Sequence, residues 1–91
     1  MNEFLNRQIA QIQFAISDFR EGELDLNALV HRLEAIGNAL GGALWKEQLF
    51  PLVVNLEGIN SELIDKKRTM NSKEQEQVNA ILKLLETISS S

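Results

Sequence analysis

The sequence predicts an all-α fold, an antiparallel four-helix bundle built as a single domain. Apolar residues recur at three- and four-residue spacings in four separate stretches, which places them on one face of a helix. Short polar or glycine-containing segments join these stretches, and none of them shows the alternation typical of a β-strand. We expect helices at about residues 3–20, 26–40, 51–67 and 73–88, with a short helical stub at 43–50.

The first expected helix, at residues 3–20, is amphipathic. Its apolar stripe consists of Leu5, Ile9, Ile12, Ile16 and Phe19. Gly22 follows the stripe, and glycine ends helices readily because it enters the left-handed backbone region without a steric penalty. We therefore expect the chain to turn at Gly22.

The second expected helix, at residues 26–40, has the clearest start signal. Asp25 stands at the N-cap position, where a side-chain oxygen accepts a hydrogen bond from an otherwise unpaired backbone N–H. The inward stripe contains Leu26, Leu29, Val30, Leu33, Ile36 and Leu40. Gly37 lies at the edge of this stripe. This glycine either lets a neighbouring helix come close or has no packing role. In the second case it is only tolerated, at a cost in helix propensity of about 1 kcal/mol relative to Ala.

The segment after the second helix contains two consecutive glycines. Continuing one helix through Gly41 and Gly42 would cost about 2 kcal/mol in helix propensity. We therefore expect the second helix to end near Leu40 and the stub at 43–50 to follow. One long helix from 26 to 50 is the alternative.

The third expected helix begins near Pro51 and runs to about residue 67. Proline disfavours helical geometry at the preceding residue, Phe50, and is well suited to a first helical position. The expected inward stripe of this helix is Leu52, Leu56, Ile59 and Leu63.

The fourth expected helix, at residues 73–88, is preceded by a capping signal. Ser72 and Gln75 fit the S-x-x-Q capping box, in which the two residues satisfy each other's backbone N–H groups. The inward residues are expected to be Val78, Ile81, Leu82, Leu85 and Ile88.

The composition excludes several kinds of chemistry. The chain has no Cys, so disulfides, thiolate nucleophiles and Cys-based zinc sites are impossible. Its single histidine, His31, is expected on an exposed polar face with Glu34, without the further ligands of a metal site or the nucleophile of a catalytic site. There is no phosphate-binding glycine loop. We therefore expect no enzymatic activity, no cofactor and no metal.

The charge and hydropathy of the chain point to a protein partner. A net charge of −4 disfavours direct nucleic-acid binding and suits a basic protein. No stretch approaches the ~20 apolar residues of a membrane span. The N-terminus lacks the basic leader and apolar run of a signal peptide. We therefore expect a cytoplasmic protein that does not bind a membrane.

Four carboxylates lie within eight residues, around the first helix–helix connection: Asp18, Glu21, Glu23 and Asp25. They form either a solvated loop with a helix cap or a docking surface that steers a basic partner. The first and third connections of an up-down bundle share one end. The basic segment 66–68 is therefore expected nearby, where it would partly neutralise the cluster.

Trp45 is the only tryptophan, and it lies in the irregular segment rather than on a clean stripe. A tryptophan in a small helical domain is commonly part of the core. An exposed tryptophan would suit a binding anchor, because tryptophan is enriched among interface hot spots. Trp45 is therefore retained as a candidate partner-binding residue beside the acidic cluster.

The pattern FREGELDLNALVHRLEAIGNAL, at residues 19–40, combines an aromatic helix end, a glycine-centred acidic turn and an amphipathic helix. Together with the size and layout of the chain, it resembles the small helical immunity proteins of the colicin D type and of contact-dependent growth inhibition systems. The resemblance implies a protein that binds the nuclease domain of a cognate toxin, an RNase or tRNase, in a one-to-one complex. Its acidic side chains would occupy the basic site where the toxin holds RNA. The implied contacts are the four carboxylates above, with Glu57, Glu62 and Asp65 as a second choice.

A different class of function is also open. The heptad-like stripes suit a helical adaptor or a homo-oligomer, such as a homodimer, whose bundle is completed by a second copy or by the amphipathic helix of a partner.

Overall fold

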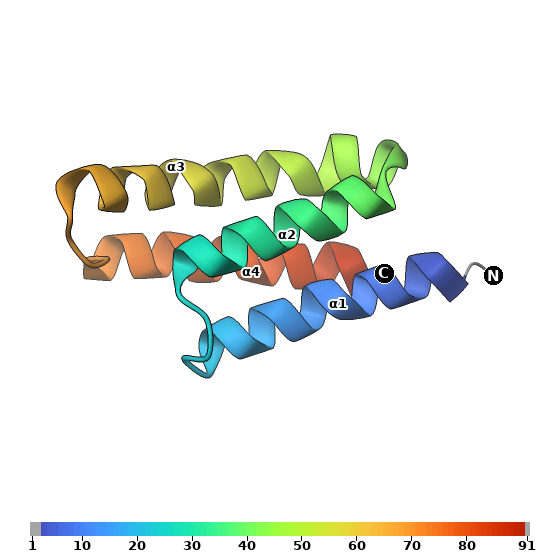
Figure 1. Cartoon of the computed structure of the whole chain (residues 1–91), viewed down its shortest axis with the longest axis horizontal. Coiled ribbons are helices and arrows are strands. Elements are labelled where there is room, and N and C mark those ends of the chain that lie inside the picture. The colour runs from blue at the N-terminus through green and yellow to red at the C-terminus, as the bar shows by residue number, and fades with distance from the viewer. Residues whose placement is uncertain (1–2, 91) are drawn as a thin grey trace.

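A computed structural model of the chain describes residues 3–90 and contains four α-helices in an antiparallel bundle (Figure 1). The α-helices are α1 (Glu3–Arg20), α2 (Leu26–Leu40), α3 (Phe50–Lys66) and α4 (Ser72–Ser90), and a π-helix, η1, spans Leu44–Leu49. No strand is present within the described range. The expected fold class is confirmed.

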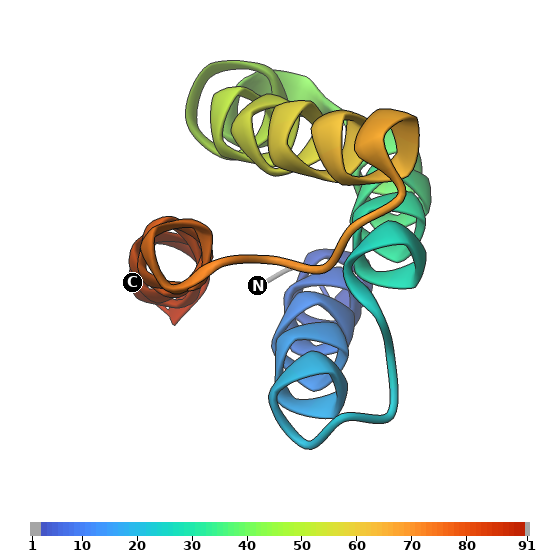
Figure 2. The ribbon, with the colours of Figure 1, turned by 90° about the vertical axis from the view of Figure 1, so that its left-hand side faces the viewer.

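The four helices pack around a square. α1 contacts α2 and α4, and α3 contacts the same two helices, so that α1 and α3 lie on one diagonal (Figure 2). The α1–α2 and α3–α4 connections lie at one end of the bundle, and η1 lies at the other. Among residues 3–90, no helix combines the length and the apolar character that a membrane crossing needs.

The core consists of the inward faces of all four helices and η1. The expected stripes of α1, α2 and α4 are confirmed as buried or half-buried. The core cluster contains Ile12, Ala15, Ile16, Leu26, Leu29, Val30, Leu33, Ile36, Trp45, Leu49, Val53, Leu56, Val78, Leu82 and Leu85.

The expected stripe of α3 is also buried or half-buried, but it does not mark the centre of the buried face. Leu56 is buried, but Leu52, Ile59 and Leu63 are half-buried, and the centre of the buried face instead includes Val53 and Asn60. A run of apolar residues at 52–54 leaves the helix register ambiguous in the sequence. The polar Asn60 faces inward because its side-chain amide donates a hydrogen bond to Asn27 Oδ1 of α2, at 2.9 Å.

The chain bends between α2 and η1. Gly41 and Gly42 have φ values of +60° and +72°, which excludes one continuous helix from 26 to 50.

η1 then runs directly into α3. Phe50 is helical, with φ −57° and ψ −44°, and its N–H bonds the carbonyl of Trp45. The expectation that proline keeps Phe50 out of the helix is therefore wrong: Pro51, which has no N–H, stands where the π pattern gives way to the α pattern.

Trp45 belongs to the core. Its side chain is 8% exposed and lies against Gly37 of α2, where a Cβ atom would overlap the indole ring. Phe50 packs edge-on to the same ring, with ring centroids 5.5 Å apart. Gly37 therefore allows the Trp45 ring to lie close to the backbone of α2. Trp45 is buried, so it is not the exposed binding anchor that one interpretation of the sequence proposed.

The capping box of α4 lies one residue earlier than expected. Asn71 Oδ1 accepts from the Glu74 N–H at 2.8 Å, and the Asn71 N–H donates to Glu74 Oε1 at 3.1 Å. The prediction of Ser72 and Gln75 in these roles is wrong. Both pairs have the same spacing, and Glu74 is selected because Arg68 holds its carboxylate with two further hydrogen bonds.

Candidate docking surface

The acidic turn, residues 18–25, is held in one shape by backbone hydrogen bonds. The Gly22 N–H donates to Phe19 O at 3.1 Å, and the Glu23 N–H donates to Asp18 O at 2.8 Å. Gly22 adopts φ +84°, a region that favours glycine. Asp25 caps α2 as expected, because its Oδ1 accepts from the Ala28 N–H at 2.8 Å.

The carboxylates of the acidic turn remain largely available to solvent. Glu21 and Glu23 are exposed, and within residues 3–90 neither takes part in an ion pair. Asp18 pairs with Arg32 at 3.2 Å in a solvent-exposed contact. The nearby Arg20 is directed elsewhere, to Glu86 of α4 at 2.7 Å. Among the described residues, the turn therefore presents two carboxylates without an ion pair beside two that serve the fold.

The basic segment 66–68, at the end of α3, forms no ion pair with the acidic turn within residues 3–90. Lys66 and Arg68 contact Glu62, with N–O distances of 2.9 and 3.8 Å. Arg68 also forms a two-point contact with Glu74, at 2.6 and 2.9 Å. The hydrogen bond from Arg68, aided by the backbone of Asn71, lowers the pKa of the Glu74 carboxyl to about 2. The expected neutralisation of the turn by this segment is therefore not found among the ion pairs of the described residues.

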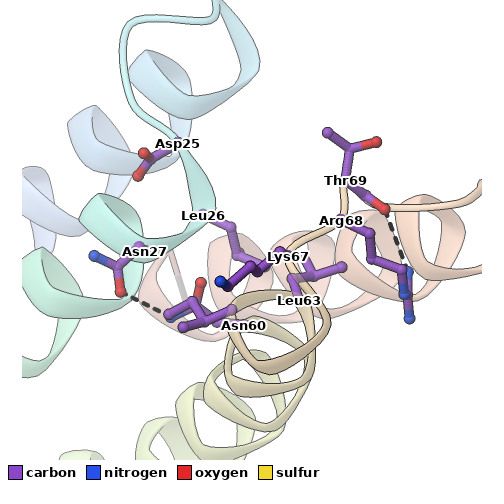
Figure 3. A pocket seen from close by; sticks show the side chains of 9 residues that line it. Asp25, Leu26, Asn27, Asn60, Leu63, Lys67, Arg68 and Thr69 are labelled. Carbon is purple, nitrogen blue, oxygen red and sulfur yellow. Dashed lines mark hydrogen bonds between the residues drawn. The ribbon is translucent and has the colours of Figure 1, made fainter.

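An open pocket of about 390 Å³ adjoins the acidic turn, between the start of α2 and the end of α3 (Figure 3). Its apolar lining comes from Leu26, Leu63 and Ile64, and Ile64 is 57% exposed. Asp25 stands on one side of the pocket and Arg68 on the other. The pocket therefore has an apolar lining with charged groups at its rim, which is the composition of many protein interfaces.

The Asn27–Asn60 hydrogen bond also lines this pocket and joins α2 to α3 beneath it (Figure 3). Sequence reasoning missed this pair. The available signal was an asparagine on each of two helices, which gives no indication that the two face each other. The hydrogen bond satisfies Asn60, which is otherwise buried.

The other sequence candidates lie apart from the acidic turn. Trp45 is at the opposite end of the bundle, in η1 (Figure 1). Glu57, Glu62 and Asp65 are exposed on α3, and Glu62 is engaged by the basic residues described above. The structure therefore brings together Asp18, Glu21, Glu23 and Asp25 but not Trp45.

The surface is suited to binding through charge and apolar contact. His31 is exposed, as expected, and in the described part of the chain no three His, Asp or Glu side chains gather to hold a metal ion. Carboxylates on a fixed turn beside an apolar pocket can contact a cationic protein surface without a large ordering cost.

Comparisons with known proteins returned no relative. No protein-family model matches the chain, and no curated protein or solved structure is significantly similar to it.

Proposed function

We propose that this protein is an immunity protein, which binds a cognate toxin nuclease and blocks its active site. The toxin would be an RNase or tRNase with a basic substrate-binding surface. The observation that carries the proposal is the pair of exposed carboxylates at Glu21 and Glu23, free of ion pairs within residues 3–90, on a turn fixed by backbone hydrogen bonds.

The proposed mechanism is occlusion. A nuclease holds RNA phosphates with cationic side chains, and the carboxylates of the acidic turn would occupy the same positions. Opposite charges on the two proteins would accelerate their encounter and select the orientation. The apolar pocket beside Asp25 would add contact area near the rim of the acidic turn. The protein itself would catalyse nothing and would act in the cytoplasm, on the toxin's protein surface alone.

The test compares three tagged forms of the chain in a capture experiment from the cells that produce it. They are the natural sequence, a turn variant with Glu21→Lys and Glu23→Lys, and a control with Glu3→Lys and Glu47→Lys. The control changes the charge by the same amount at exposed positions that make no ion pair within the described residues. Mass spectrometry would identify what remains bound at high salt, and an RNA-cleavage assay would measure inhibition.

We expect the natural chain and the control to retain a basic nuclease stoichiometrically and to inhibit it, and the turn variant to lose both properties. Capture of a nuclease equally by all three folded forms would remove the acidic turn from the interface. Capture of no nuclease by the natural chain would refute the immunity function itself.

A further inference from the structure

α4 carries a second stripe of residues that faces away from the core. The stripe follows the four-three spacing of a helix–helix seam and consists of Lys73, Gln77, Ala80, Leu84 and Thr87. Leu84 is 51% exposed although it is a large apolar residue. The small Ala80 at the centre of the stripe would allow another helix to approach closely.

A groove of about 400 Å³ lies beside this stripe, between α3 and α4. It is lined by Asn55, Ile59, Gln77, Ala80 and Ile81. None of these side chains is charged. A second molecule of this acidic chain could therefore seat a helix here without burying like charges against each other.

The charges at the edge of the stripe have a self-complementary pattern. Glu76 and Lys83 are seven residues apart, so both lie on the same side of the stripe. Both are exposed, and within residues 3–90 neither takes part in an ion pair. When two α4 helices run antiparallel about a two-fold axis near Ala80, Glu76 of each copy lies opposite Lys83 of the other. The two-fold axis thus generates two opposite-charge contacts from one pair of residues.

We propose that the outer face of α4, with the α3–α4 groove, is the interface of a homodimer. The occupant is a second copy of this chain, because the charge pattern is complementary to itself in the antiparallel orientation. Leu84 of each copy is covered by the other, and the Glu76–Lys83 contacts set the register.

The dimer interface and the acidic turn lie on different sides of the bundle. Figure 2 shows α4 on one side and the α1–α2 connection on the other. A dimer would therefore present two accessible acidic turns. The dimer interface and the acidic turn share no residue. Loss of self-association and loss of nuclease binding can therefore be measured separately.

The test is a charge-swap series followed by sedimentation equilibrium. The natural chain has a mass of 10.3 kDa, and we expect its average mass to rise toward twice that value with concentration. Glu76→Lys and Lys83→Glu each place like charges in both contacts, and each is expected to weaken the dimer about tenfold. An equimolar mixture of these two variants restores opposite charges in both contacts, and its mass should rise again.

Leu84→Gln tests the apolar part of the interface, and we expect it to weaken the dimer. Phe14→Gln is the matched control, because Phe14 is 62% exposed, belongs to α1 and does not line the groove. It should leave the mass unchanged. Circular dichroism would establish that every variant is folded.

The proposal would be overturned by a constant monomer mass for the natural chain, by self-association that survives both charge reversals, or by a mixture that stays monomeric. A monomer whose α3–α4 groove is protected from hydrogen exchange only by a helix of another protein would identify the face as an adaptor site and would also overturn it.

Discussion

The indole ring of Trp45 lies against Gly37, at a distance that leaves no room for a Cβ atom. Gly37→Ala is therefore expected to destabilise the protein by about 1–3 kcal/mol, although alanine is the better helix former. The midpoint of urea unfolding measures the effect, and the single tryptophan supplies the fluorescence signal.

Gly58→Ala is the matched control for this substitution. Gly58 also lies inside a helix, but nothing lies within 4 Å of a Cβ added there. Its replacement should stabilise the protein by about 0.5–1 kcal/mol. If both variants were more stable than the natural chain, the Trp45 ring would have to move aside at little cost, which would contradict its tight packing against Gly37.

The Arg68–Glu74 contact predicts a pH dependence of stability. Arg68 lowers the pKa of the Glu74 carboxyl to about 2 from its usual 4.5. Because the folded-state pKa is the lower one, the ionised carboxylate stabilises the fold above about pH 4.5. This contribution is lost as the pH falls from about 4.5 toward 2.

Glu74→Gln should therefore reduce the difference in stability between pH 7 and pH 3, measured as the free energy of unfolding in urea. Glu57→Gln provides the comparison, since Glu57 is exposed and makes no ion pair within residues 3–90. If the two variants had the same pH profile, Glu74 would not be the group responsible.

Lys67 ends α3 in the left-handed conformation, with φ 52° and ψ 47°. A side chain there costs about 1–2 kcal/mol, and glycine is the usual residue at this position. Lys67→Gly is expected to stabilise the protein by about 0.5–1 kcal/mol after the greater freedom of the unfolded glycine chain is included. Lys67→Ala removes the charge but retains the strain, so its melting temperature should stay near that of the natural chain.

The Asn27–Asn60 hydrogen bond should be required for stability although it is polar. Asn60→Ala leaves the Asn27 amide without this partner and is expected to cost about 1–2 kcal/mol. Asn38→Ala, at an exposed position of α2, is expected to have almost no effect. Thermal unfolding of the two variants would measure the difference, and equal melting temperatures would contradict the assigned role of Asn60.

Local signals in the sequence predicted most helix boundaries. The bounds of α1 and α2 agree with expectation because the apolar spacing and the Asp25 cap act over only a few residues. The two glycines at 41–42 ended α2 for the same reason: their effect on the backbone does not depend on distant contacts.

The choice between equivalent local patterns required the folded chain. Both possible capping boxes before α4 have the same spacing, and Arg68 distinguishes Glu74 from Gln75. The inward face of α3 is likewise set by packing with other helices: Val53 and Leu56 are buried in the core, and Asn60 faces inward with its amide hydrogen-bonded to Asn27.

Some features of the candidate docking surface likewise follow from the sequence, and others depend on the folded chain. The sequence by itself determined that four carboxylates lie around one turn, because they are neighbours along the chain. Only the tertiary structure decided that a pocket forms between α2 and α3 and that Trp45 is buried. These features depend on contacts between residues distant in sequence or on how side chains fill space, and neither quantity is encoded in local spacing.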